Sequence, residues 1–173
     1  MTVAPHAALR RVNSALEWLF LAIGAVLFAI YIAVVFAEVF ARNYIGLSLI
    51  WADEVAVMCF VWSVFLGAAV AVRRQAHYVV DLVPDHYERT QTLVKLAAKL
   101  LCVILIYVMI VGGMTFASMG FGRRSFALGL PMAYVFVAVP VSGIAMALFT
   151  VEIVVDDLKK IAGWMTTGSE APK

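Results

Sequence analysis

Residues 42–81 read RNYIGLSLIWADEVAVMCFVWSVFLGAAVAVRRQAHYVVD and hold a charge-free apolar run with charges at both ends. Asp53 and Glu54 stand at the start of the run, and Arg73 and Arg74 follow its last residue. Carboxylates at the depth of a bilayer are costly unless a partner or a wet surface receives them. The pattern therefore predicts a membrane-spanning helix that meets other protein segments at its ends.

The composition is that of an integral membrane protein. Hydrophobic residues make up 65% of the 173 residues and charged residues 14%, whereas a soluble domain has roughly 45–50% and 25%. About 20 helical residues cross a bilayer core. Four charge-free stretches are close to this length or exceed it: 18–37, 55–72, 100–122 and 125–151. The sequence predicts an all-α membrane protein with four transmembrane helices in a single domain, residues 1–173.

Capping and turn residues refine the predicted helices. We expect them at about 15–42, 50–72, 93–120 and 131–156, with residues 1–8 and 166–173 disordered. Gly46 is expected to end the first helix and Ser48 to cap the second. Pro140 removes a backbone donor and is expected to kink the fourth helix.

A polar stretch precedes the third predicted helix. Around residues 93–101, leucines and alanines keep helical spacing, while Lys95 and Lys99 fall on another face. We predict an amphipathic cytoplasmic segment here that lies partly in the membrane interface.

The distribution of Lys and Arg predicts the orientation. If the N-terminus is cytoplasmic, ten of these residues lie on that side and three on the other. This positive-inside bias predicts that both termini are cytoplasmic. The first apolar run is too long for a signal peptide, and no small-x-small cleavage site follows it before Glu38, so we expect it to be retained.

The middle of each apolar run lacks titratable side chains. A proton-coupled carrier or an ion channel normally places one there, and a haem anchor needs histidines within helices, whereas His6, His77 and His86 fall in predicted cytoplasmic segments. Cys59 and Cys102 lie in apolar runs and are predicted to be packing residues. We expect no enzyme activity, catalytic residue, metal site, cofactor or nucleic-acid partner.

Charged and aromatic residues near the first turn are predicted to form ion pairs or subunit contacts: Glu38, Arg42, Trp51, Asp53 and Glu54. Glu38 and Arg42 are four residues apart, so they share a helical face and can pair. Adjacent Asp53 and Glu54 point about 100° apart and cannot share one partner face. We predict that one acid pairs with Arg42 and the other meets a partner subunit. The alternative is two solvated carboxylates at a helix start.

Arg73, Arg74, His77 and Asp81 form a predicted motif at the cytoplasmic end of the second helix. The positive-inside rule accounts for the two arginines without any further role. His77 and Asp81 are four residues apart and can pair on one helical face.

Arg123 and Arg124 stand on the side that is otherwise depleted of basic residues. They either contact lipid phosphates or offer a cationic surface to an acidic periplasmic partner. The sequence is compatible with both interpretations.

The chain resembles the small membrane (Q) subunit of tripartite ATP-independent periplasmic (TRAP) transporters. The resemblance covers about residues 10–160 and depends on motifs in a fixed order: Arg42 through Ser48, Trp51-x-Asp53-Glu54, Trp62, Gly67-Ala68-Ala69, Arg73-Arg74, His77-x-x-x-Asp81, Ala127-Leu-Gly129-Leu-Pro131 and Pro140. Asp53 is a departure, because glutamate is common there in the family.

The resemblance implies a sodium-driven importer of carboxylate-type solutes in the bacterial inner membrane. A large (M) membrane subunit would carry solute and sodium, and a periplasmic solute-binding (P) protein would deliver the solute. This chain would be the small subunit that scaffolds the large one and helps dock the binding protein, in contact with membrane lipid. Two alternatives are a standalone four-helix channel or carrier, and a membrane anchor of a redox complex.

Overall fold

The computed structural model describes residues 5–74 and 88–167, and their side chains at 10–74 and 100–154. These residues are helical almost throughout, in the order α1 Pro5–Phe40, π-helical turn η1 Ala41–Ile45, α2 Ile50–Arg73, α3 Glu88–Gly120, α4 Ala133–Phe136 and α5 Ala138–Thr167. Four long apolar stretches can cross a membrane: Arg10–Ile45, Ile50–Arg73, Leu100–Gly120 and Ala133–Val154. The prediction of an all-helical fold with four apolar stretches long enough to span a membrane is confirmed for the described residues.

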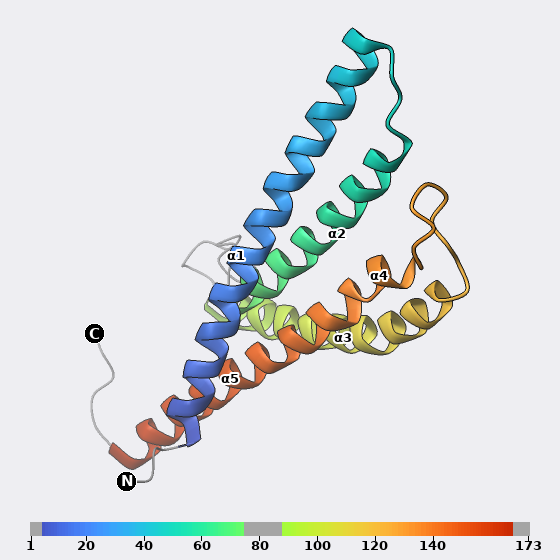
Figure 1. Cartoon of the computed structure of the whole chain (residues 1–173). Helices are drawn as coiled ribbons and strands as arrows, with labels where there is room; N and C mark the ends of the chain where they lie inside the picture. Colours follow the sequence, from blue (N-terminus) through green and yellow to red (C-terminus); the bar gives the residue numbers. More distant parts are fainter. Residues whose placement is uncertain (1–4, 75–87, 168–173) are drawn as a thin grey trace.

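The helices form two pairs that diverge from one end of the molecule (Figure 1). α1 packs against α2, and α3 packs against α5. Contacts between α2 and α5 connect the two pairs. The pairs lie close together near the N-terminal part of α1. They separate toward the connections at residues 46–49 and 121–132 (Figure 1).

The small apolar core lies where the two pairs meet. Its buried members come from α2, α3 and α5: Ala69, Val72, Ile106, Ala145, Met146 and Phe149. Most large apolar side chains on α1 and α3 are instead exposed. Such faces are expected of helices in a bilayer, where lipid rather than water surrounds apolar side chains.

The helical turn after α1 ends at Gly46, as the sequence predicts. Gly46 adopts a left-handed conformation with φ of 74°, and its N–H bonds to the Ala41 carbonyl. The predicted cap by Ser48 is wrong, because Leu49 occupies the cap position and no side chain bonds there. The Ala52 N–H instead donates to the Leu49 carbonyl at 2.9 Å.

The predicted fourth helix is divided into α4 and α5 by a turn at Val137. Pro140 has no N–H for the Phe136 carbonyl, so one rung of the helical ladder is missing here, while Val137 and Val141 still donate to the carbonyls four residues before them. The Trp62 indole N–H donates to the Tyr134 carbonyl at 2.9 Å. The helix is thus interrupted three residues before the proline at which a kink is predicted, and an indole from α2 bonds to a carbonyl beside the interruption.

Several helix ends differ from the predicted bounds. α1 begins at Pro5 rather than near residue 15, and α5 continues to Thr167, so residues 5–8 and 166–167 are helical. Proline suits the first turn of a helix, because its missing N–H has no intrahelical partner there. The predicted amphipathic segment is part of a continuous α3, and its side chains before Leu100 lie outside the described residues.

Glycines let α3 approach α4 and α5 closely. A Cβ at Gly120 would lie 2.7 Å from the Ala133 backbone, and one at Gly113 would lie 3.0 Å from the Pro140 ring. A Cβ at Gly143 would lie 3.1 Å from the Ile110 side chain. Close backbone approach through small residues is a general way to pack helices in lipid.

We predict that Gly120→Ala destabilises the chain and that Gly112→Ala, on the same helix, does not. The Gly120 methyl would meet backbone that cannot rotate away, at a cost of about 1–3 kcal/mol for overpacking. A Cβ at Gly112 meets no atom within 4 Å, so alanine should be neutral or stabilise the helix by up to about 1 kcal/mol. Thermal unfolding in detergent measures both, and equal midpoints would contradict the close approach.

Candidate functional site

A charged cluster joins α1, α2 and α5 at the end where the helix pairs meet. The Arg73 guanidinium lies between Glu17 of α1 and Glu152 of α5. Its Nε and Nη2 atoms donate to the two Glu152 oxygens, each at 3.4 Å, and its Nη1 donates to Glu17. Only 14% of the Arg73 side chain and 10% of the Glu152 side chain are exposed. The arginine therefore links both outer helices to α2.

Two further side chains complete this cluster. The buried Asn13 amide donates to Glu152 Oε2 at 2.7 Å, and Arg74 Nε donates to Glu17 Oε1 at 2.7 Å. The Phe149 ring lies 5.6 Å from the Arg73 guanidinium carbon, within the range of a cation–π contact. The charged cluster thus comprises Asn13, Glu17, Arg73, Arg74 and Glu152.

The charges of the cluster cancel, with two acids facing two arginines. A buried charge without a partner is strongly destabilising, whereas a paired and hydrogen-bonded one is tolerated. In the described part of the chain, every buried side-chain nitrogen or oxygen has a hydrogen-bond partner. The cluster is therefore a fully satisfied junction of three helices.

Sequence reasoning found the arginines of this cluster and missed their partners. Glu17 and Glu152 are 56 and 79 residues from Arg73, so no local spacing connects them. A signal was present, because each acid borders an apolar run at the same predicted membrane side as Arg73. His77 and Asp81, predicted to belong with the arginines, lie outside the described residues.

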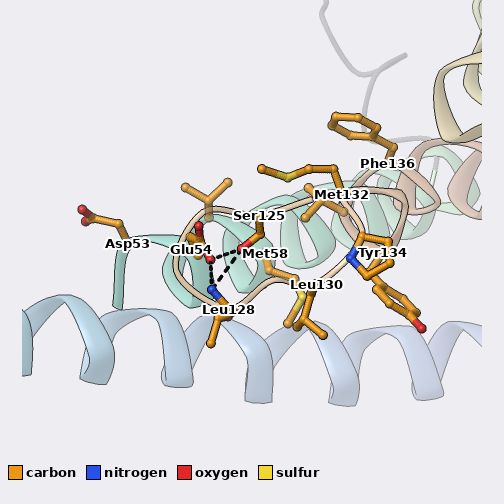
Figure 2. A pocket seen from close by; sticks show the side chains of 12 residues that line it. Asp53, Glu54, Met58, Ser125, Leu128, Leu130, Met132, Tyr134 and Phe136 are labelled. Atoms are coloured by element: carbon orange, nitrogen blue, oxygen red, sulfur yellow. Dashed lines mark hydrogen bonds between the residues drawn. The ribbon is translucent and has the colours of Figure 1, made fainter. Parts of the chain in front are cut away.

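At the opposite end, Glu54 holds the 121–132 hairpin against the start of α2 (Figure 2). Its carboxylate accepts the backbone N–H of Ala127 at 2.8 Å and of Leu128 at 2.9 Å. The Ser125 hydroxyl also donates to it. These donors come from residues more than 70 positions away, so the Glu54 contact joins α2 to the connection between α3 and α4.

The predicted pairing of Arg42 with Asp53 or Glu54 is wrong. Arg42 Nη1 lies 3.7 Å from Glu38 Oε1, one helical turn before it. The Glu54 oxygens already accept three bonds from the hairpin, and the Asp53 carboxylate points away from them (Figure 2). Trp51 lies half-exposed beside them. Asp53 is exposed, as the solvated alternative expects.

The 121–132 hairpin has a defined backbone. The Ser125 N–H donates to the Leu130 carbonyl at 2.8 Å, and the Met132 N–H donates to the Arg123 carbonyl at 2.9 Å. Gly129 adopts φ of 66° at the turn, a conformation that favours glycine. Arg123 and Arg124 are exposed on this hairpin, and Arg124 Nη1 lies 3.4 Å from the Gly129 carbonyl.

Two apolar cavities accompany these contacts. One, of about 350 Å³, lies between the start of α2, the 121–132 hairpin and α4 (Figure 2). The other, of about 630 Å³, is lined by α2, α3 and Met146 of α5. Among the described residues, no three His, Cys, Asp or Glu side chains are grouped so that they could hold a metal ion.

Taken together, the polar contacts fix both ends of a divergent frame. The charged cluster holds α1, α2 and α5 where the pairs meet, and the Glu54 contact ties the hairpin to α2 where they separate. Their chemistry is that of structural hydrogen bonds and ion pairs between helices.

Comparison with known proteins gives the family. Residues 31–160 match the DctQ component of tripartite ATP-independent periplasmic transporters, well over half of the chain. The chain belongs to the DctQ family of TRAP transporter small permease components. The resemblance noted from the sequence motifs is confirmed. A DctQ chain is a transporter permease component and not an enzyme, and it is a multi-pass inner-membrane protein.

Two curated relatives are named as TRAP transporter permease proteins. The "Sialic acid TRAP transporter permease protein SiaT" of Haemophilus influenzae (strain 86-028NP) is 31% identical over 147 residues, 80% of this chain. This DctQ chain spans only 22% of that relative's length. The "Putative TRAP transporter small permease protein" of Haemophilus influenzae (strain ATCC 51907 / DSM 11121 / KW20 / Rd) is 21% identical over 132 residues, covering 76% of this chain and 80% of the relative. No solved structure matches.

We predict that Arg73→Ala destabilises this DctQ chain far more than Arg74→Ala. Loss of Arg73 leaves Glu152 buried without its cation, a change that costs on the order of 3 kcal/mol. Arg74 is 58% exposed, and exposed ion pairs contribute about 1 kcal/mol or less. Thermal unfolding in detergent compares the two variants, with Arg73→Lys expected between wild type and Arg73→Ala because lysine keeps the charge but not the forked donors. Equal losses for the two alanine variants would contradict the assigned roles.

We also predict that Glu54→Gln loosens the 121–132 hairpin and that Asp53→Asn, its neighbour, does not. Glutamine has one acceptor oxygen and would turn an amide N–H toward the donors of the hairpin. Hydrogen exchange at residues 125–130 should rise by about tenfold in Glu54→Gln, as expected for a lost charge-assisted contact. Exchange unchanged from wild type would show that the hairpin does not depend on Glu54.

Proposed function

We propose that this chain is the static scaffold of a TRAP transporter, which stabilises the large (M) transmembrane subunit. The observation that supports this is that the least exposed charged groups at the two ends of the frame join its own segments. Glu17, Arg73 and Glu152 are used in this way at one end, and Glu54 at the other. A moving transport domain needs a fixed frame to slide against, and packed, fully satisfied junctions resist deformation.

The exposed apolar faces of α1 and α3 support a large membrane partner. The most apolar stretch of α1 has none of its residues buried within this chain. In lipid, such faces are solvated by acyl chains, and a second membrane protein can cover them by close packing. We propose that the large subunit covers part of this surface.

We propose that both termini are cytoplasmic. Asn13, Arg73 and Glu152 lie together at one end of the molecule, and the basic residues of the sequence concentrate on that side. The 121–132 hairpin is then periplasmic, where Arg123 and Arg124 are available to a periplasmic solute-binding (P) protein.

We propose import of a carboxylate-type solute driven by sodium, with solute and sodium bound by the large subunit. The relative that matches over 80% of this chain is named for sialic acid, which carries a carboxylate. The solute-binding groups would lie in the other subunits, so this chain would hold the large subunit in position and would not bind the solute.

Copurification and solute-uptake assays test the scaffold proposal. Co-expressed with the large subunit, the chain should copurify in equal amounts and remain associated in nanodiscs. Proteoliposomes with both subunits and the binding protein should import solute on a sodium gradient, and omission of this chain should reduce uptake by at least about tenfold, as loss of correct positioning does. Purification as a stable monomer, with full uptake by the large subunit without it, would contradict the scaffold.

Controls separate the scaffold from the two alternatives. A standalone channel or carrier would give solute flux in liposomes that contain this chain only. A redox anchor would give a haem spectrum in the purified chain. Either result would replace the proposed function.

A further inference from the structure

The apolar cavity beside the 121–132 hairpin has the size of a small-molecule site. Its volume is about 350 Å³, and it lies between the start of α2, the hairpin and α4 (Figure 2). Sites for small ligands are clefts of roughly 300–1,000 Å³ that are lined mainly by apolar side chains. One turn of a helix, 10–12 Å wide and 5.4 Å high, needs about 400 Å³ or more. The volume therefore suits a section of a lipid acyl chain and is too small for a helix of another subunit.

The lining of this cavity is polar at one end and apolar along the rest. Asp53 lies at one end of the lining, and Phe136 lies toward the other (Figure 2). Asp53 stands in the first turn of α2, where the membrane-spanning stretch begins, and the apolar Val57 follows one turn deeper. The charged end of the cavity is therefore at the level of lipid headgroups, and its apolar part extends toward the acyl chains.

The two acids at this end of α2 differ in what they offer a ligand. Glu54 already accepts three hydrogen bonds from the hairpin. Asp53 lines the same cavity and is exposed, and it takes part in none of the ion pairs between described residues. A carboxylate at the edge of a bilayer needs a partner or a wet surface. The Asp53 carboxylate is thus placed to accept a cationic group.

Arg124 adds the opposite charge on the same face of the hairpin. It forms an antiparallel bridge with Pro131, and residues directly opposite each other in such a pair extend their side chains to one face. Pro131 lines the cavity. Arg124 Nη1 also lies 3.4 Å from the carbonyl of Gly129, whose two neighbours in the chain both line the cavity. An exposed guanidinium therefore accompanies the Asp53 carboxylate at this site.

The two charges together select one class of lipid headgroup. A purely anionic headgroup would pair with Arg124 but would be repelled by Asp53. A choline headgroup carries a cation without N–H donors, so it cannot donate to a carboxylate. A phosphate next to a primary ammonium supplies an anion for the guanidinium and three N–H donors for the carboxylate.

We propose that this cavity binds a phospholipid with an ethanolamine headgroup. Its ammonium would donate to Asp53, its phosphate would pair with Arg124, and a section of one acyl chain would lie between α2 and α4. Glu54 is a positioning residue for this site, because it holds the hairpin that forms one wall. Arg123 is left for the contact proposed above with a periplasmic protein. The proposal depends on the membrane location of the family and not on the scaffold role.

The lipid selectivity of the purified protein tests this proposal. The chain, with the subunits that accompany it, is placed in nanodiscs with equal parts of ethanolamine, glycerol and choline phospholipids that share the same acyl chains. Native mass spectrometry after release from the nanodiscs counts the retained lipids. The ethanolamine lipid should be retained about fivefold over either of the others, as one exposed ion pair can provide. Equal retention of the three lipids would overturn the proposal.

Charge variants identify the groups that recognise the headgroup. Asp53→Asn should abolish the preference for the ethanolamine over the glycerol lipid, because it removes the partner of the ammonium. Arg124→Gln should lower the retention of all three lipids, because each carries a phosphate. Arg123→Gln, on the same hairpin, is the matched control and should retain lipid as wild type does. Unchanged selectivity in Asp53→Asn, or equal losses in the two arginine variants, would overturn the proposal.

Trp62 reports whether the retained lipid lies in this cavity. Its indole bonds to the carbonyl of Tyr134, a lining residue. In a chain whose other tryptophans are replaced by phenylalanine, brominated acyl chains should quench Trp62 more strongly on ethanolamine lipid than on glycerol lipid. Val57→Phe should remove this difference by filling the cavity. Val111→Phe should preserve it, because Val111 is similarly exposed (50% against 55%) but lies on α3, outside the lining. Equal quenching by the two lipids would overturn the proposal.

Comparison of the isolated chain with the assembled complex distinguishes a lipid from a protein cover. Lipid selectivity and Trp62 quenching should be present in both. Their presence in the isolated chain and absence from the complex would show that another subunit covers the cavity, and would overturn the proposal. Full solute uptake without this chain would refute the scaffold role and leave the lipid site standing, because the two readouts are independent.

Discussion

The constraint on which this fold depends is the burial of Arg73 between Glu17 and Glu152. A guanidinium at the edge of a membrane core is tolerable only with acidic partners and filled hydrogen bonds. Three helices must therefore bring their ends to one point, where Asn13 and Arg73 Nε both donate to Glu152 Oε2. That junction joins the ends of α1 and α5 to the end of α2, and the small apolar core around Phe149 packs directly beside it.

Away from this junction the helices diverge, and different contacts define the frame. Close approach at Gly113, Gly120 and Gly143 sets the distance between α3 and the last two helices. The Glu54 contact then links the hairpin back to α2. Lipid supplies no hydrophobic drive for helices to associate, so polar contacts and close backbone packing must do most of the work of specifying the arrangement.

The distribution of bonded polar side chains and exposed apolar surfaces bears on the role of a small permease component. The buried polar side chains of the described frame are bonded within the chain, whereas long apolar faces of α1 and α3 and the tip of the 121–132 hairpin are left exposed. A subunit built this way is suited to hold a larger membrane protein in place and to present a fixed contact point on one side. Solute chemistry would then belong to its partners.

The sequence by itself determined the four apolar stretches long enough to span a membrane, the turn at Gly46 and the family. These features depend on local composition, on the length of apolar runs and on the backbone chemistry of single residues, all of which act within a few positions.

The partners of the charged side chains were decided only by the tertiary structure. Glu54 was predicted to face Arg42, its near neighbour across a turn, but the helices place it against the hairpin more than 70 residues later. Arg73 likewise finds its acids 56 and 79 residues away. Which charge meets which depends on how the helices cross, and the crossing arises from the packing of all of them at once.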